Sequence, residues 1–405
     1  MDSGDTTWIL VSSALVLVMT PALAFFYGGM VRKKNILSTL NLSFIMMALI
    51  SIQWLLYGYT LAFGSDVKGL IGGLEFLGFA GVGPETSDLA PTIPHMLFAA
   101  FQMMFAIITP ALITGAFVER VRFKTFLVFS LLWATLVYDP VCHWVWGGGI
   151  LGSDGLGALD FAGGTVVHIT AGFSALAFAL AIGPRKGFGK TSFEPSNIPY
   201  SVLGAGLLWM GWFGFNGGSA LAADGLAVHA LFTTNTAAAA AGLVWMILSW
   251  IDNKPSVLGI VTGAVVGLVA VTPGAGFVTP LGALLIGGLA APISYYAIKF
   301  VKGRNLIDES LDVFACHGLG GLWGALATGL FATTAVNAGG ANGLFYGNPG
   351  QFLSQLWAAL IAIVVSVAVT YLLAKILDRL MGLRVSDSEE QVGLDISEHA
   401  ERAYA

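Results

Sequence analysis

Charged residues are scarce in this sequence. Lys, Arg, Asp and Glu account for 10% of its 405 residues, whereas 56% are hydrophobic and 12% are aromatic. Soluble domains carry about 25% charged residues, so a chain this poor in charge does not match a soluble domain of its size. We therefore predict an integral membrane protein, and we expect no nucleic-acid partner.

Cysteine is also rare. The two cysteines, Cys142 and Cys316, both fall in apolar runs. They provide neither a disulfide framework nor the spacing of a metal site, so we expect no metal ion and no other cofactor. The first residues, Met1–Trp8, contain two aspartates and no basic residue. That start is not typical of a cleavable signal peptide.

Long apolar runs make up most of the chain. A transmembrane helix needs roughly 20 mostly apolar residues. A window of this length predicts eleven spans, at about 6–31, 38–63, 92–118, 125–145, 163–183, 199–218, 226–250, 256–273, 277–298, 310–333 and 352–380. The predicted fold is therefore an all-α, polytopic membrane protein.

Basic residues alternate regularly between the loops that connect these spans. Seventeen of the 18 Lys and Arg residues fall at one set of span ends, and Lys68 alone falls at the other. Cytoplasmic loops carry the excess of Lys and Arg. We therefore expect residues 1–380 to form a transmembrane domain with its N-terminus outside. Residues 381–405 would form a polar cytoplasmic tail.

Two histidines lie inside predicted spans, His168 in the fifth and His317 in the tenth. Ionisable residues are costly in lipid, so they often mark a solute or proton path. Because the offset of five spans is odd, the two halves would insert in opposite orientations, as in an inverted repeat. We predict repeat one at about 6–183 and repeat two at about 199–333. Helix eleven, at about 352–380, would be added to this five-plus-five core.

The two histidines enter the membrane from opposite faces. At a rise of 1.5 Å per residue, each would lie roughly 8–10 Å from its end of the bundle, so the two rings can meet near the middle. Facing imidazoles can share one proton and leave their other nitrogens free to line a narrow path. The alternative is two separate histidines with packing roles.

Aromatic residues lie in the outer and central thirds of several spans: Phe101, Phe105, Trp146, Trp212 and Phe215. Aromatic faces attract cations within about 6 Å, and apolar rings can close a pore to hydrated ions. Ser219, at the outer end of the sixth span, is placed to accept a hydrogen bond from a solute. An ordinary aromatic belt with core packing is the alternative for the same residues.

Two aspartates precede the histidine segments. Asp160 stands eight residues before His168, where an aspartate is a favoured helix N-cap. A structural cap is the first interpretation of Asp160, and a direct cation ligand is the second. Asp312 is the candidate for the matching position in the tenth span, although it stands five residues before His317 instead of eight.

Three segments combine these residues: Asp160–His168 (DFAGGTVVH), Gly211–Ser219 (GWFGFNGGS) and Asp312–Gly318 (DVFACHG). Together with the tail segments GLRV (382–385) and GLDISEH (393–399), they resemble the ammonium transporter/Rhesus family, on its bacterial ammonium-transporter branch. The resemblance covers nearly the whole chain. The outer loop 64–91 matches no motif of the family.

This resemblance implies eleven helices, a homotrimer and one pore in each subunit. It implies an outer ammonium-recruitment site of Phe101, Phe105, Trp146 and Ser219, a phenyl gate of Phe105 and Phe215, a pore lined by His168, His317 and Trp212, and structural support of the outer site by Asp160. A regulatory protein of the PII type on the cytoplasmic face is a further partner that the resemblance implies.

The leading hypothesis is therefore an ammonium transporter in a prokaryotic inner membrane, with methylammonium as an analogue, and not an enzyme. Ammonium would lose a proton at the outer site, and neutral ammonia would pass the gate and the twin histidines. The proton would follow separately, as a second hypothesis. Two other functions stay open: a channel for another small solute such as urea or water, and an ammonium sensor that signals through its tail.

Overall fold

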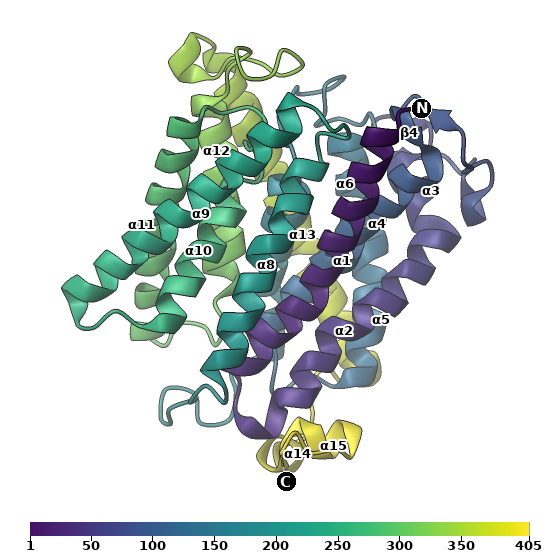
Figure 1. Ribbon diagram of the computed structural model, residues 1–405. Coiled ribbons are helices and arrows are strands. Elements are labelled where there is room, and N and C mark those ends of the chain that lie inside the picture. The colour runs from purple at the N-terminus through teal and green to yellow at the C-terminus, as the bar shows by residue number, and fades with distance from the viewer. Residues whose placement is uncertain (405) are drawn as a thin grey trace.

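The structure is a computed structural model, and it describes residues 1–404. Within these residues, ten helices are long and apolar enough to cross a membrane, and the shorter apolar helix Val257–Val271 makes eleven. The two termini lie at opposite ends of the bundle, as an odd number of spans requires (Figure 1). We refer to the end that holds the N-terminus as the outer end and to the end that holds the C-terminal tail as the inner end.

Every predicted span overlaps one of these helices, which confirms the predicted fold class. The first half contains α1 (Ser3–Met30), η1 (Lys33–Asn35), α2 (Ile36–Gln53), the π-helix η2 (Trp54–Gly58), α3 (Tyr59–Phe63), α4 (His95–Ile113), η4 (Thr114–Ala116), α5 (Phe123–Trp133), the π-helix η5 (Ala134–Tyr138), α6 (Asp139–Trp146), the π-helix η6 (Gly164–Ile169) and α7 (Thr170–Ile182).

The second half contains α8 (Ile198–Gly218), α9 (Gly225–Asp252), α10 (Val257–Val271), α11 (Pro280–Gly303), the π-helix η7 (Phe314–Leu319) and α12 (Gly320–Phe331). The short η8 (Leu344–Tyr346), the long α13 (Pro349–Met381) and the two tail helices α14 (Asp387–Val392) and α15 (Leu394–His399) complete the chain. The first helix of each half, α1 and α8, pack along each other, so they form one seam between the halves (Figure 1).

The loop 64–91, which the sequence left without a role, covers the outer end of α6. It holds η3 (Leu77–Phe79), and two hairpins are built from β1 (Asp66–Val67) with β2 (Ile71–Gly72) and from β3 (Thr86–Ser87) with β4 (Ala90–Pro94). The His143 ring of α6 bonds the Asp66 carboxylate at 2.9 Å, and the Trp144 indole donates to the Leu70 carbonyl at 2.7 Å. These bonds fix the first hairpin on α6.

Helix α10 is too short to cross a membrane alone. It ends at Val271 and is followed by a buried turn toward the outer end. Residues from Thr272 to Phe277 are all buried. Their backbone groups bond to neighbouring segments, with the Pro273 carbonyl accepting from Phe161 N at 3.0 Å and the Ala275 carbonyl from Thr233 Oγ1 at 2.7 Å. Irregular backbone is tolerated at membrane depth where protein covers it in this way.

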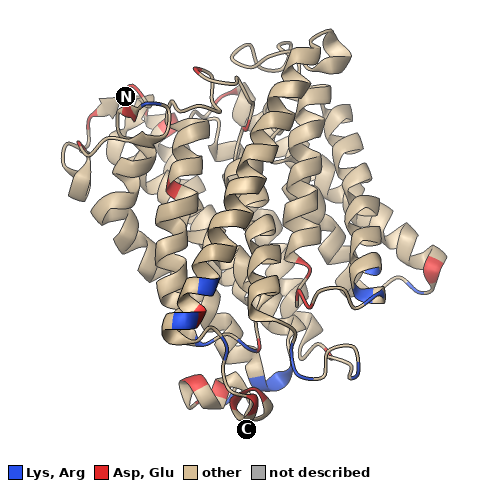
Figure 2. Cartoon of the chain, turned by 180° about the vertical axis from the view of Figure 1, so that it is seen from behind, with Lys and Arg blue, Asp and Glu red and all other residues tan. Residues whose placement is uncertain are grey.

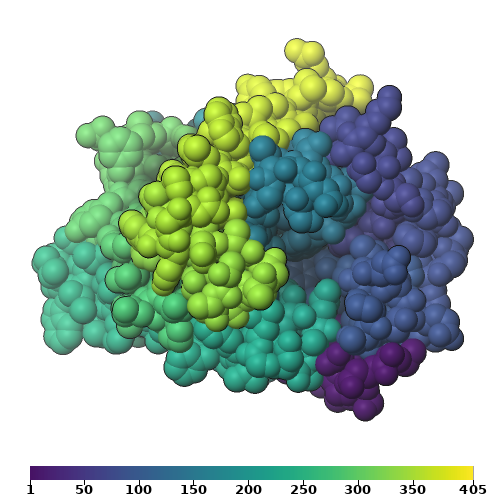
Figure 3. Space-filling view, turned by 90° about the horizontal axis from the view of Figure 1, so that it is seen from above, coloured from purple at the N-terminus to yellow at the C-terminus, as the bar shows by residue number. Residues whose placement is uncertain are grey.

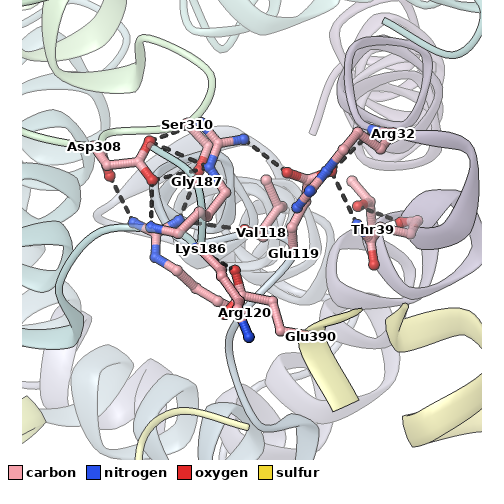
Figure 4. Close-up of polar contacts among 12 residues, drawn as sticks. Arg32, Thr39, Val118, Glu119, Arg120, Lys186, Gly187, Asp308, Ser310 and Glu390 are labelled. Carbon is pink, nitrogen blue, oxygen red and sulfur yellow. Dashed lines mark hydrogen bonds and ion pairs between the residues drawn. The ribbon is translucent and has the colours of Figure 1, made fainter. Parts of the chain in front are cut away.

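Lys and Arg gather at the inner end of the bundle, beside the tail, whereas acidic residues lie in short stretches at both ends (Figure 2). Several of the inner charges belong to one buried cluster, which centres on Glu119 (Figure 4). Glu119 accepts from Arg32 Nε and Asn35 Nδ2 at 2.9 Å each, and from Arg185 Nη1 at 2.7 Å. Arg185 also pairs with Asp308 at 2.7 Å. The cluster therefore ties inner loops of the two halves together.

Arg120 is fully buried beside this cluster and donates to backbone and side-chain oxygens of both halves. It bonds the Asp308 carbonyl at 2.6 Å and Ser310 Oγ at 2.8 Å. The tail joins the same region through Glu390, which pairs with Arg384 at 2.6 Å and accepts from Lys186 N at 2.7 Å. The tail is therefore packed onto the inner loops, and it does not extend away from them (Figure 4).

The Glu119 carboxyl is an ionised group inside this cluster. Burial raises the pKa of Glu119, but the charges of Arg185 and Arg32 and their hydrogen bonds outweigh burial and lower the pKa to about 2. Its pKa in an unfolded chain is about 4.3. The ionised carboxylate therefore adds stability that is fully present above the unfolded pKa and is lost as pH falls toward 2.

We predict that Glu119→Gln destabilises the protein at neutral pH by about 3 kcal/mol, because it leaves Arg32 without an anionic partner and leaves Arg185 with Asp308 alone. The midpoint of thermal unfolding in detergent should fall, and the difference from wild type should shrink as pH drops from 4.3 toward 2. Glu85→Gln, at an exposed position, is the control and should unfold like wild type. An unchanged midpoint for Glu119→Gln at pH 7 would contradict the prediction.

Candidate functional site

A cavity of about 440 Å³ opens at the outer end between the two halves. Its lining includes residues that the sequence singled out and several that it did not: Phe105, Trp146, Asp160, Ser219, Gln102, Phe161, Phe277 and Asn337. The view from above shows the outer segments of both halves side by side, with residues near 150 beside the yellow-green start of α13 (Figure 3). The cavity is therefore a junction between distant parts of the chain.

Trp146 is the last residue of α6 and forms one wall of this outer cavity. Its indole Nε1 donates to the Asp160 carbonyl at 2.9 Å. Its ring meets the Phe105 ring edge-on, with the centroids 6.0 Å apart. The hydrogen bond fixes the indole, so an aromatic face borders the cavity in a set orientation.

Ser219 follows α8 and lies on the same cavity. Its hydroxyl donates to the Phe215 carbonyl at 2.8 Å, so the lone pairs of the oxygen are left to accept a bond from a solute. Gln102 adds a second acceptor, since its buried Oε1 has no partner within the described residues. Sequence reasoning missed Gln102, because one polar residue in the apolar run of α4 carries no distinguishing pattern.

Asp160 caps the start of η6 with both carboxylate oxygens. Oδ1 accepts from Gly163 N at 2.9 Å and Gly164 N at 2.6 Å, and Oδ2 accepts from Thr165 N at 2.7 Å and Val166 N at 3.1 Å. A carboxylate offers about four lone-pair sites, and these bonds occupy all of them. The geometry therefore favours the structural cap over a direct cation ligand.

The matching position in the second half belongs to Glu309, so the assignment of Asp312 was wrong. Asp312 pairs with Lys302 at 2.6 Å. Glu309 stands eight residues before His317, the spacing of Asp160 and His168, and accepts from Phe314 N at the start of η7 at 3.3 Å. The sequence contains this equal spacing, but the expectation of a second aspartate favoured Asp312.

Two phenyl rings separate the outer cavity from the interior. The centroids of Phe105 and Phe215 lie 4.4 Å apart, and both side chains are buried. Phe101 packs edge-on against Phe105 at 5.0 Å and lies behind it, away from the cavity lining. Phe105 lines the outer cavity and Phe215 lines the next space inward, so this ring pair lies between the two spaces.

His168 and His317 meet directly inside the ring pair. Their Nδ1 atoms lie 3.3 Å apart, and the Nε2 atom of His168 is buried without a partner within the described residues. The His168 ring also stacks on Phe215 at 6.0 Å and lies 5.5 Å from Trp212. The Trp212 indole is fixed by a bond to Thr272 Oγ1 at 2.9 Å. The expected contact between the two histidines is therefore present.

Glycine permits this contact, because the two histidine segments approach each other more closely than side chains would allow. A Cβ atom on Gly172 would lie 2.0 Å from Gly318 N, and one on Gly321 would lie 2.9 Å from the His168 Cβ. Both histidines also sit on π-helical turns, η6 and η7. Such turns are rare in proteins, and many of those that occur are at functional sites.

Two further cavities continue inward from the ring pair. The first, about 10 Å³, is lined by Phe215, Trp212, His168 and His317, and the second, about 160 Å³, is lined by His317, Ser310 and Asp312. A single water molecule needs about 10–15 Å³ by this measure, so the middle space holds about one small molecule. Among residues 1–404, no group of three or more His, Cys, Asp or Glu side chains is placed to hold a metal ion.

Comparison with known proteins identifies the family of the chain. The family model described as the Ammonium Transporter Family matches residues 7–404. The chain belongs to this family. It is 51% identical to the ammonium transporter of Bacillus subtilis (strain 168), over all of this chain and 99% of that protein. It is 50% identical to the ammonium transporter Amt1 of Archaeoglobus fulgidus, over the full length of both.

A solved structure of the same fold is the crystal structure of Candida albicans Mep2. It matches with a TM-score of 0.90 at 36% identity, covering 96% of this chain and 88% of that chain. The eleven-helix architecture of this ammonium transporter family member is therefore shared with a crystallised relative.

We predict that Asp160→Asn weakens the start of η6, because the side-chain amide nitrogen cannot accept the bonds that Oδ2 accepts. Two buried N–H groups lose their acceptor, which should lower the stability by about 2 kcal/mol or more. Thermal unfolding in detergent measures this. Asp154→Asn, exposed in the same loop, is the control. Equal unfolding midpoints for both variants would show that the cap is unimportant.

Proposed function

We propose that this protein carries ammonium nitrogen across the cell membrane, taking up ammonium outside and passing neutral ammonia through a pore within one subunit. The observation that carries the proposal is the row of cavities from the outer end to the inner end. A narrow space of about 10 Å³ beside the twin histidines separates the outer and inner cavities. A hydrated ion does not fit such a space.

The outer cavity supplies what an ammonium ion needs. The rings of Trp146 and Phe105 attract a cation through their faces, and Ser219 accepts a hydrogen bond from it. Phe101 supports the Phe105 ring from behind, and Asp160 supports the site by holding the Trp146 indole and the start of η6. Potassium has a similar size but donates no hydrogen bond, so a site built from acceptors discriminates against it.

Ammonium gives up a proton to solvent water in the outer cavity before ammonia passes the phenyl gate. Moving a full charge from water into an apolar wall is costly, whereas ammonia is neutral. Ammonia then passes Phe105 and Phe215 and moves along His168, Trp212 and His317, whose nitrogens are its polar partners. As a second step, the proton crosses separately along the two histidines, which share a contact between their Nδ1 atoms.

The rival functions receive less support. A channel for urea or water would not need the aromatic and hydroxyl groups that border the outer cavity. An ammonium sensor would bind without flux, and the half-identical relatives are named as transporters. The predicted absence of enzymatic chemistry stays a prediction.

The assembly is proposed to be a homotrimer in lipid, with repeat one at about 6–183, repeat two at about 199–333 and helix eleven outside both. Residues with exposed apolar side chains, such as Val228, Phe232, Leu243 and Trp250 on α9, face lipid or a neighbouring subunit. The gathering of Lys and Arg at the inner end supports a cytoplasmic tail and an external N-terminus. The same inner face is the expected docking surface of a PII-type protein.

Current on a solid-supported membrane after an ammonium jump tests the function, with purified protein in liposomes and an internal pH dye. A saturable current that potassium does not elicit supports ammonium transport with charge movement. A pH change without current supports electroneutral ammonia passage and removes the separate proton step. The absence of both signals would overturn the proposal.

We predict that His168→Ala lowers the ammonium flux at least tenfold, because the pore wall loses a polar partner for the solute. A tenfold fall corresponds to a barrier about 1.4 kcal/mol higher. The variant should still elute as the wild-type oligomer. His229→Ala is the control, since His229 bonds the Val278 carbonyl at the outer end of α9, outside the pore. Normal flux in His168→Ala would remove the histidines from the mechanism.

We also predict that deletion of residues 386–405 leaves ammonium selectivity intact and changes the maximal rate or the response to a PII-type protein. The deletion keeps the backbone bridge between Val121 and Arg384. It removes Glu390, which accepts from Lys186 N in an inner loop, and Asp395, which accepts from Ser38 N at the start of α2. Flux and binding of the PII-type protein, compared with the full chain, measure the effect. No change in either would make the tail a passive extension.

A further inference from the structure

A glutamine on α13 uses every hydrogen-bonding position of its side-chain amide. Gln355 Oε1 accepts from Leu159 N at 2.6 Å and from Gln351 Nε2 at 3.3 Å. Its Nε2 donates to the Leu159 carbonyl at 2.8 Å and to the Ala325 carbonyl at 3.1 Å. The side chain is 1% exposed. An amide that is buried and fully bonded is held in one orientation.

The pairing with Leu159 resembles one rung of an antiparallel ladder, with a side-chain amide in place of a peptide group. Both backbone polar groups of Leu159 bond to it. Gln351, one helical turn earlier, bonds the Gly157 carbonyl at 3.0 Å and adds a second tie to the same segment. The approach to Asp160 is therefore anchored to α13 and, through Ala325, to α12.

Asp160, the next residue, connects two parts of the site, the Trp146 ring and the π-helix η6. Its carbonyl accepts the Trp146 indole at 2.9 Å, and its carboxylate caps the π-helix that carries His168. Gln355 lies outside the lining of the outer cavity. Its direct hydrogen bonds to the segment before Asp160 go to the backbone of Leu159.

We propose that Gln355 is a positioning residue for the outer ammonium site: by holding Leu159 it fixes the Asp160 carbonyl and, with it, the Trp146 ring relative to Ser219. Helix α13, which lies outside the proposed repeats, thereby sets the affinity of a site that it does not line. The inference rests on the proposed outer recruitment site.

Replacement of the amide should separate affinity from turnover. Gln355→Leu keeps the volume but leaves both polar groups of Leu159 without partners, so the ammonium concentration for half-maximal current should rise about tenfold, the equivalent of about 1.4 kcal/mol. Maximal current per folded oligomer should change less. Gln355→Glu keeps the acceptor for Leu159 N but places a carboxylate oxygen against the Leu159 and Ala325 carbonyls, so it should also raise the half-saturating concentration.

Ser366→Ala is the matched control on the same helix. Ser366 is buried, and its hydroxyl has no partner within the described residues, so its removal should leave the half-saturating concentration unchanged. Trp146→Ala tests the site on which the inference rests. Size-exclusion elution and the unfolding midpoint check that each variant is folded.

The expected result is a raised half-saturating concentration in Trp146→Ala and Gln355→Leu and a wild-type value in Ser366→Ala. A raised value in Trp146→Ala with wild-type values in both Gln355 variants would overturn the positioning role alone. A loss of maximal current at unchanged half-saturation in Gln355→Glu would also overturn it, and this variant decides if Gln355→Leu does not fold. An unchanged value in Trp146→Ala would overturn the outer site itself.

Discussion

Polar groups that leave water must find partners inside the protein, and this requirement governs the structure from end to end. It explains why the Asp160 carboxylate takes four backbone N–H groups, why the Trp212 indole bonds Thr272, and why Arg120 is surrounded by carbonyl oxygens. Several buried polar atoms lack a protein partner within the described residues. Two of them, His168 Nε2 and Gln102 Oε1, belong to side chains that line the proposed solute path.

In the proposed mechanism, the same requirement selects which solute can pass. The space between the phenyl rings and the twin histidines is lined by aromatic and aliphatic side chains and by the two histidines, so it offers too few polar atoms to replace the hydration shell of a cation. A neutral molecule with one lone pair and three N–H groups needs few partners, and the histidine nitrogens provide them. Close approach of Gly172 to Gly318 is what brings those nitrogens together, so small residues contribute to the pore without touching the solute.

Much of this architecture could be predicted from the sequence, because its signals are long or additive. Span lengths follow from runs of apolar residues, and the meeting of His168 with His317 follows from their position in opposed spans. Local backbone geometry was harder to predict from the sequence. No sequence pattern predicted the π-helices or the buried turn after α10, since each depends on which neighbour supplies a hydrogen bond. The role of Glu309 was missed although its spacing to His317 equals that of Asp160 to His168. The role of Gln355 could not be predicted from the sequence either, since it depends on hydrogen bonds to the backbone of Leu159.

The two histidine segments share a backbone plan but differ in how firmly they are held. The outer cap, Asp160, makes four bonds and is anchored by Gln355 from α13, whereas Glu309 at the inner segment has an Oε1 atom without a partner within the described residues. Selection of a cation needs rigid acceptors at fixed distances, while release of a neutral solute does not. In the proposed mechanism, the bonds that α13 makes to the outer segment therefore fit a pore that selects at one end and releases at the other.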